Sequence, residues 1–161
     1  MTTTAKQVLC RLYTDKTITL AARDGSRYIS KENGVFRSFI DSCFKSWGLD
    51  KTSKATEKTE VFVYEMVKDA TFTEMFDSLN LDRDKLCLSQ DQIIEFCEMN
   101  ADKLREDFYA TFFLFKQDVQ LFIARVHVGL DGLDVRVYSF KRDYLWPSSN
   151  AYRLVVPQPN S

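Results

Sequence analysis

Apolar and polar side chains alternate along the last third of the chain, and this alternation predicts β-strands. From Tyr109 onward apolar residues recur at every second position, the period of a strand with one buried face. We expect four strands in this region, which cover 110–116, 119–128, 133–140 and 154–156. Turns at Gln117-Asp118 and Asp131-Gly132 would join the first three, and Pro157 would end the last because proline cannot donate to a β-ladder.

A different period, with apolar residues three and four positions apart, predicts helices further toward the N-terminus. One apolar stripe predicts a helix over 35–47; its members are Phe36, Phe39, Ile40, Cys43, Phe44 and Trp47. Two further helices would begin at capping boxes, in which a Ser or Thr precedes Glu or Gln by three positions. These boxes are Thr71 with Glu74, and Ser89 with Gln92, and we expect the second helix to continue toward Leu104.

The remaining apolar runs predict strands near the N-terminus and one strand in the middle of the chain. Runs at 8–13 and 17–22 suggest a hairpin, and Asp24-Gly25 suggests a tight turn into a further run at 27–30. The run at 60–67 is apolar on both faces, which indicates a buried strand. The order of strands and helices predicts an α+β fold with a mixed or antiparallel sheet and two or three helices.

The totals place the chain among ordinary globular proteins. With 161 residues and a net charge of −1 it has the size of a single domain, and it has no overall attraction for nucleic acid or anionic membrane. No apolar run is long enough to span a bilayer, and the N-terminus lacks the features of a signal peptide. Four cysteines without a C-x-x-C pair favour a reduced, cytoplasmic setting.

Catalytic motifs are missing from the sequence. The only histidine is His127, and the sequence contains no G-x-G-x-x-G, Walker A or G-x-S-x-G pattern. The carboxylates are dispersed, and the cysteines lack the spacing of zinc ligands. We therefore expect a non-enzymatic protein without a metal or cofactor.

The polar half of the strand pattern carries the functional signal. If Val126, Val128, Val135 and Val137 face the core, then a polar set shares the opposite face, namely Arg125, His127, Asp134, Arg136 and Tyr138. Tyrosine, serine, asparagine and arginine are common in binding surfaces, because they combine contact area with adaptable hydrogen bonds. The same pattern also fits an ordinary solvated sheet face, so the pattern alone leaves both interpretations open.

Several segments resemble a family of largely uncharacterised bacterial proteins. They are LCLSQDQIIEFCEMNADKLREDFYATFFLFK, LFIARVHVGLDGLDVRVYSF, Trp146, RLVVPQ, the N-terminal MTTTAKQVL and ATEKTEVFVYEMVKDATF. The order of a capped helix, an apolar strand, a hairpin, a Trp-containing loop and a final strand is also similar to the end of C-type-lectin-like domains. The variable proteins of diversity-generating retroelements use that ending.

The resemblance implies a single domain over 1–161, with a scaffold at 1–108 and a β-rich region at 109–161 that displays a diversified binding face. Its ligand would be an unknown protein or small molecule. The framework implied comprises Ala124, Val126, Val128, Leu133, Val135, Val137, Phe140, Trp146, Arg153, Val155 and Val156. The displayed ligand-binding set implied comprises His127, Asp134, Arg136, Tyr138, Ser139, Lys141, Arg142, Asp143, Ser148, Ser149, Asn150 and Tyr152.

A nucleic-acid-binding module is the alternative function. Between Arg125 and Arg153 the chain carries five basic and three acidic residues. Four aromatic residues lie among them and could stack on bases, namely Tyr138, Tyr144, Trp146 and Tyr152. The excess of positive charge is small, so we rank this alternative second.

Overall fold

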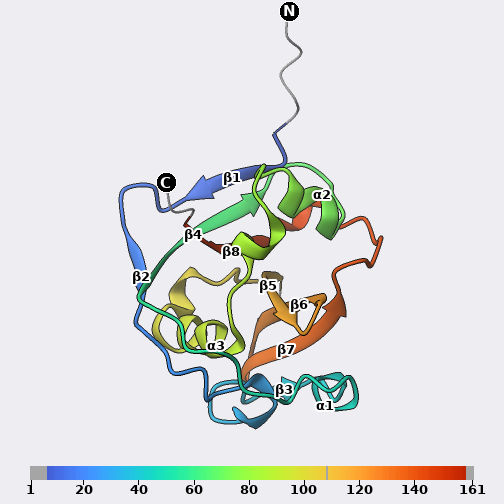
Figure 1. Ribbon diagram of the computed structural model, residues 1–161. Helices are drawn as coiled ribbons and strands as arrows, with labels where there is room; N and C mark the ends of the chain where they lie inside the picture. Colours follow the sequence, from blue (N-terminus) through green and yellow to red (C-terminus); the bar gives the residue numbers. More distant parts are fainter. Residues whose placement is uncertain (1–6, 108, 159–161) are drawn as a thin grey trace, which may run out of the picture.

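The computed structural model describes residues 7–107 and 109–158, which fold around a mixed eight-stranded sheet (Figure 1). The strand order is β1-β4-β8-β5-β6-β7-β3, and β2 pairs with β4 beside β1. The strands are β1 (Leu9–Leu12), β2 (Ile18–Leu20), β3 (Phe39–Ile40), β4 (Thr59–Met66), β5 (Ala110–Gln117), β6 (Gln120–Gly129), β7 (Gly132–Ser139) and β8 (Arg153–Pro157). The predicted α+β fold class with a mixed sheet is therefore confirmed.

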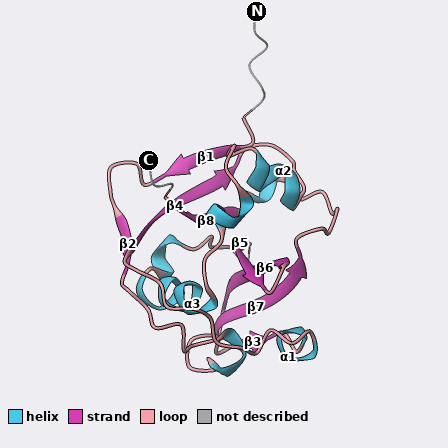
Figure 2. Ribbon diagram, viewed as in Figure 1, coloured by secondary structure: helices cyan, strands magenta, loops and turns pink. Residues whose placement is uncertain are grey.

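Helices cover the sheet on both faces (Figure 2). The α-helices are α1 (Cys43–Ser46), α2 (Phe72–Asp77) and α3 (Gln90–Met99). Short 3₁₀-helices cover Ile29–Lys31, Arg83–Leu86, Ala101–Lys103 and Ser148–Asn150. Both predicted capping boxes are present: the Thr71 hydroxyl accepts from the Glu74 amide, the Ser89 hydroxyl accepts from the Gln92 amide, and each Glu or Gln side chain accepts in return.

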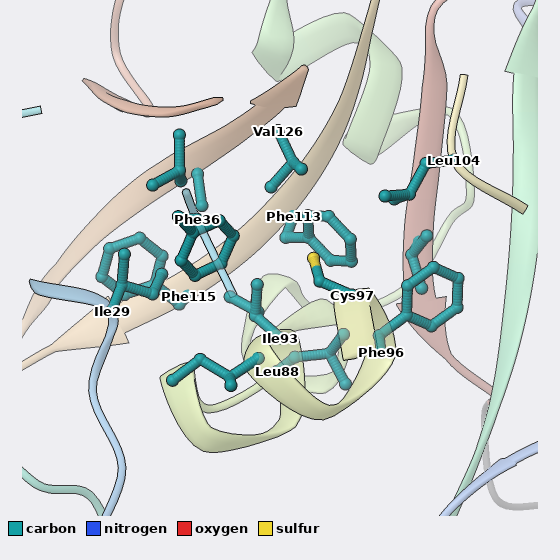
Figure 3. Close-up of a cluster of buried hydrophobic side chains, with 14 of the residues drawn as sticks. Ile29, Phe36, Leu88, Ile93, Phe96, Cys97, Leu104, Phe113, Phe115 and Val126 are labelled. Atoms are coloured by element: carbon teal, nitrogen blue, oxygen red, sulfur yellow. The ribbon is translucent and has the colours of Figure 1, made fainter. Parts of the chain in front are cut away.

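Two hydrophobic clusters, one on each face of the sheet, form the core. On one face Ile93, Phe96 and Cys97 of α3 pack against Phe113 and Phe115 of β5 (Figure 3). On the other face, residues of α2 and of the segment after β7 pack against the sheet, namely Phe72, Met75, Phe76, Phe140 and Trp146. Successive residues of β5 point to opposite faces, and both faces are buried, which explains its continuous run ATFFLF.

The C-terminal strands β5, β6 and β7 form a meander, and strand β8 lies beside it. Strands β5, β6 and β7 pair antiparallel in chain order, as predicted. Gly129 pairs with Gly132, so the second turn consists of Leu130 and Asp131, one position earlier than expected. Strand β8 lies between β4 and β5, antiparallel to the first and parallel to the second, so it joins the N-terminal strands to the meander.

The helix predicted over 35–47 is wrong. Phe39 and Ile40 instead form β3, which pairs parallel to β7, and only Cys43–Ser46 is helical. The carboxylate of Asp41 accepts from the amides of Cys43 and Val137, so it ends the strand pairing and starts the helical turn. The apolar stripe misled because Phe36 and Phe44 are indeed buried, although the backbone between them is not helical.

Two further expectations near the N-terminus are wrong. Strands β1 and β2 do not pair with each other as a hairpin, because both pair with β4, end to end along the same edge. The run at 27–30 is not a strand: it enters the 3₁₀-helix Ile29–Lys31, where the Ile29 amide donates to the Gln90 side chain. The helix expected to continue toward Leu104 ends at Met99.

Candidate functional site

An arginine–aromatic face lies on β6 and β7, on the side of the sheet opposite to α3. We define it by seven residues: Phe39, Arg125, Asp134, Arg136, Tyr138, Arg142 and Tyr144. Arg125 is directly opposite Arg136 in the β6–β7 register, and directly opposed residues point to the same face. Val126, Val135 and Val137 are buried on the other face, so the predicted division of these strands into an apolar and a polar side is correct.

Each arginine of this face contacts an aromatic ring. Arg125 donates from Nη1 to the hydroxyl of Tyr138 at 3.1 Å. The guanidinium carbon of Arg142 lies 4.8 Å from the ring centre of Tyr138 and 5.6 Å from that of Tyr144. The guanidinium carbon of Arg136 lies 4.8 Å from the ring centre of Phe39. Cation–π contacts of this kind hold a guanidinium in place while its N–H edge stays available.

Trp146 supports the face from below. Its backbone forms two hydrogen bonds with Ala70, which fix the loop after β7 to the segment before α2. Its ring is buried and lies 4.6 Å from the ring of Tyr144 and 5.3 Å from the ring of Phe72, centre to centre. The guanidinium carbon of Arg125 lies 5.5 Å from the Trp146 ring. The face therefore rests on the second hydrophobic cluster, which limits its freedom to move.

The face combines exposed rings with exposed positive charge. Phe39 is 42% exposed and Tyr144 is 48% exposed, and the side chain of Arg136 is 48% exposed. Asp134 is the single acidic member; its carboxylate lies 3.5 Å from Nε of Arg136 and is mostly covered. Sequence reasoning missed Phe39, which it assigned to a helix, and no local signal reveals that β3 pairs with β7.

The displayed set predicted from sequence divides into groups. Asp134, Arg136, Tyr138 and Arg142 belong to the face, and His127 lies beside them on β6, opposite Asp134. Lys141 and Asp143 are exposed in the loop that follows β7. Ser139 is exposed but points to the other side of the sheet, because it has the same parity along β7 as Val137; its hydroxyl accepts from the Lys141 amide.

A second group lies near the start of β8. Ser148 donates from its amide and its hydroxyl to Asp69, and these bonds lower the pKa of that carboxyl. Ser149 is exposed, and Asn150 donates to the hydroxyl of Tyr152. The backbone oxygen of Asn150 also accepts from Nε of Arg105. The hydrogen bonds of this group therefore join it to Asp69, Arg105 and Tyr152, which are not members of the arginine–aromatic face.

Tyr152 is not a displayed side chain, which corrects the expectation. It is only 5% exposed, because its ring stacks on Phe112 at 5.3 Å and meets the edge of Trp146 at the same distance. The alternation along 152–156 places this ring in the second hydrophobic cluster. Its role is in packing.

A groove on another part of the surface offers less chemistry. It encloses about 740 Å³ between the segment before β4, the start of α3 and the end of β8. Its lining includes Lys58, Lys85, Glu60 and Cys87. Burial raises the pKa of the Cys87 thiol to about 12, so the reactive thiolate is scarce at neutral pH. Positively charged lysines and negatively charged glutamates line the groove together, so the groove favours neither an anionic nor a cationic ligand.

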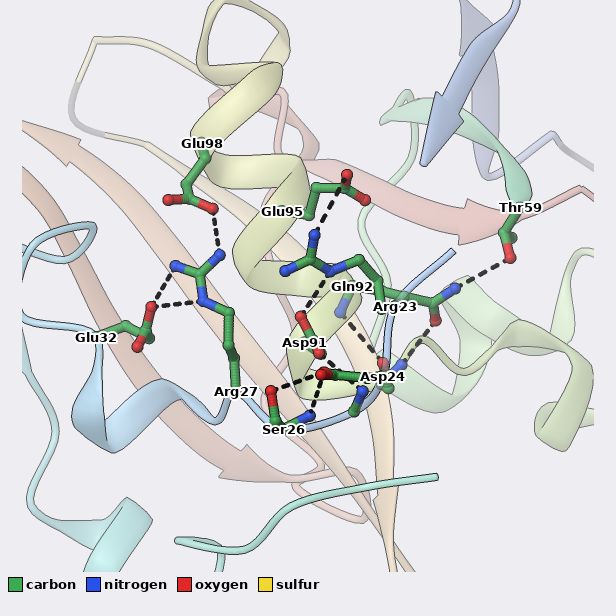
Figure 4. A network of polar contacts seen from close by, with 12 residues as sticks. Arg23, Asp24, Ser26, Arg27, Glu32, Thr59, Asp91, Gln92, Glu95 and Glu98 are labelled. Atoms are coloured by element: carbon green, nitrogen blue, oxygen red, sulfur yellow. Dashed lines mark hydrogen bonds and ion pairs between the residues drawn. The ribbon is translucent and has the colours of Figure 1, made fainter. Parts of the chain in front are cut away.

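A polar network over α3 holds two arginines among acidic side chains (Figure 4). Arg23 pairs with Asp91 and Glu95, and Arg27 pairs with Glu32 and Glu98. The hydrogen bond from Arg27 lowers the pKa of Glu98, and that from Arg23 to Asp91 raises the pKa of the Arg23 guanidinium. Because these charges pair with one another and fix the segment after β2 to α3, we assign the network to stability.

Within 7–107 and 109–158, no group of three or more His, Cys, Asp or Glu side chains is placed to hold a metal ion. No helix of that same part of the chain has the length and apolar character to cross a membrane.

Comparison with family models, with curated proteins and with solved structures found no match for the chain. The resemblances to a bacterial family and to lectin-like variable proteins therefore stay predictions.

Proposed function

We propose that this protein is a binding protein that recognises an anionic partner through the arginine–aromatic face. The observation that carries the proposal is the gathering of three guanidinium groups, each against an aromatic ring, on one side of the β6–β7 hairpin. Proteins favour arginine for binding carboxylate and phosphate groups, because its planar guanidinium can donate two parallel hydrogen bonds to them.

Charge complementarity supports an anionic partner. The whole chain has a net charge of −1, whereas the face carries three arginines and one aspartate. Lys141 and Asp143, exposed beside it, leave the excess of positive charge unchanged. A local excess of one sign attracts a partner of the opposite sign and raises the rate of encounter.

The rigidity of the support also favours binding. The arginine side chains are already held by rings and by the Tyr138 hydroxyl, so their immobilisation costs less conformational entropy when a partner binds. The rings in turn rest on Trp146, which the paired backbone of Ala70 fixes in place. A preorganised face of this kind needs little rearrangement to bind.

The scaffold would allow the face to differ between related copies, and we include this diversification in the proposal. Substitutions at exposed positions such as Arg136, Lys141 and Arg142 change stability by less than about 0.5 kcal/mol in typical cases. Copies from one genome should then differ mainly within 127–152, and a reverse-transcriptase gene with a template repeat should lie nearby. Uniform scatter of the differences along the chain would contradict diversification without affecting the binding proposal.

The binding proposal can be tested by NMR with two probes of matched charge, oligo-glutamate and oligo(dT). At low salt we expect at least one probe to shift the amide resonances of β6, β7 and 141–144. The double variant R136A/R142A should abolish these shifts. K16A/K51A removes the same charge from two exposed lysines outside the face and should retain them. The proposal fails if neither probe shifts these resonances, or if both double variants respond alike.

A further inference from the structure

We infer that the partner of the arginine–aromatic face is single-stranded nucleic acid. The inference rests on the proposed function and names the chemical class of the partner. Positive charge alone would suit any polyanion. What favours unpaired bases is the pair of exposed rings that accompanies the charge, Phe39 and Tyr144.

The two rings lie toward opposite ends of the face. Phe39 on β3 is in register with Asp134 near the start of β7, and Tyr144 lies against Arg142, which stacks on Tyr138. Residues 134 and 138 are about 14 Å apart along an extended strand. The rings and arginines therefore form a track that follows β7, and an extended chain with repeating flat groups can lie along it.

Unpaired bases explain why such rings would be exposed. Aromatic side chains on an open sheet face stack on bases, and this stacking tolerates every base because each has a π-face. An acidic peptide would use the guanidinium groups but would leave Phe39 and Tyr144 without a matching surface. A duplex would hide its base faces, so it too would leave the rings unused.

The arginines are placed to bind phosphates between the stacked bases. The guanidinium carbons of Arg136 and Arg142 each lie 4.8 Å from a ring centre, and a guanidinium that contacts a ring can still donate from its edge to oxygen acceptors. Asp134 lies 3.5 Å from Arg136 and restrains it without covering its side chain, which is 48% exposed. Stacking and phosphate contacts would thus alternate along the track.

Fluorescence anisotropy with labelled oligo(dT) and oligo(rU) tests the inference. We expect binding at low salt that weakens as salt rises, with a slope of log K against log salt of about −1.4 for the two phosphate contacts of Arg136 and Arg142. Tyr144→Ala should weaken binding roughly tenfold, and Tyr144→Phe should restore it because the ring is what stacks. Trp47→Ala is the matched control: Trp47 is 47% exposed but lies at the end of α1, beside Phe122 on the other side of the sheet.

The outcomes separate this inference from the proposed function. If oligo-glutamate binds in an R136A/R142A-sensitive way and the oligonucleotides do not, the nucleic-acid inference is overturned and the binding proposal stands. If neither polyanion binds, both fail. Equal affinity for duplex and single strand, or equal losses in Tyr144→Ala and Trp47→Ala, would also overturn the inference. A thermal melt of each variant shows that the fold is intact.

Discussion

Arg23 donates a hydrogen bond from Nε to the Oδ1 of Asp91 at 2.8 Å, and this bond joins the segment after β2 to the first turn of α3. The other oxygen of Asp91 accepts from the amide of Gly25 at 2.9 Å, and the carboxylate is fully buried. Gly25 has a φ of +81°, and a Cβ there would lie 2.2 Å from the carbonyl oxygen of Ser53. The buried carboxylate of Asp91 and the glycine required at position 25 thus together fix the contact between the segment after β2 and α3.

Asp91→Ala should lower the free energy of unfolding by about 3 kcal/mol, because it leaves Nε of Arg23 and the buried amide of Gly25 without their acceptor. Urea denaturation of the variant and the parent measures the difference. Asp102→Ala removes an exposed carboxylate that pairs with Lys103 at the surface, and it should change stability by less than about 0.5 kcal/mol. Equal effects of the two substitutions would contradict the structural role given to Asp91.

Acid should weaken the fold partly through Glu98. The Arg27 guanidinium, which donates a hydrogen bond to Glu98, holds the pKa of this carboxyl below its ordinary value of 4.5. A carboxyl with a lowered pKa in the folded state stabilises the fold above its unfolded pKa, and that contribution is lost as pH falls through the folded pKa. Melting temperatures should therefore fall as pH drops below about 4.5, and Glu98→Gln should flatten the fall. A matching change in Glu106→Gln, which alters an exposed glutamate, would refute this attribution.

The two tryptophans should report separate environments. Trp146 is buried among Phe72, Phe112 and Tyr152, whereas Trp47 is about half exposed. In Trp47→Phe, the remaining emission should be blue-shifted and shielded from acrylamide; in Trp146→Phe, it should be red-shifted and readily quenched. The reverse pattern would show that the loop after β7 does not pack as described.

Thiol labelling should distinguish the cysteines by burial. Cys10 is exposed, while Cys97 is fully buried, which raises the pKa of its thiol and keeps reagents away. A disulfide reagent at mild alkaline pH should label Cys10 first and Cys97 only in denaturant. Cys10→Ser should remove the fast phase. Rapid labelling of Cys97 in the native protein would contradict the packing of α3 against β5.

Local signals predicted the elements that depend on neighbouring residues. The capping boxes at Thr71 and Ser89 and the meander of β5, β6 and β7 follow from short spacings, and the structure confirms them. The helix expected over 35–47 failed because a distant strand, β7, provides backbone partners for Phe39 and Ile40. Local periodicity cannot show such a partner.

The candidate site shows the same limit. The period of two assigned Arg136 and Tyr138 to one face, because alternation is an intrinsic property of a strand. Membership of Phe39 in that face depends on the pairing of β3 with β7, about a hundred positions away. The prediction that Tyr152 is displayed failed for a related reason. Its ring packs on Phe112 of β5, and the sequence pattern does not reveal that contact.

The position of β8 has a consequence for how the chain is made. Residues 153–157 lie between β4 and β5, so the two halves of the sheet have no shared backbone pairing until this segment is available. During synthesis, the edges of β4 and β5 that pair with β8 therefore stay unpaired until residues 153–157 have emerged from the ribosome. Until then those edges are open to pairing with other chains, which is a route to aggregation.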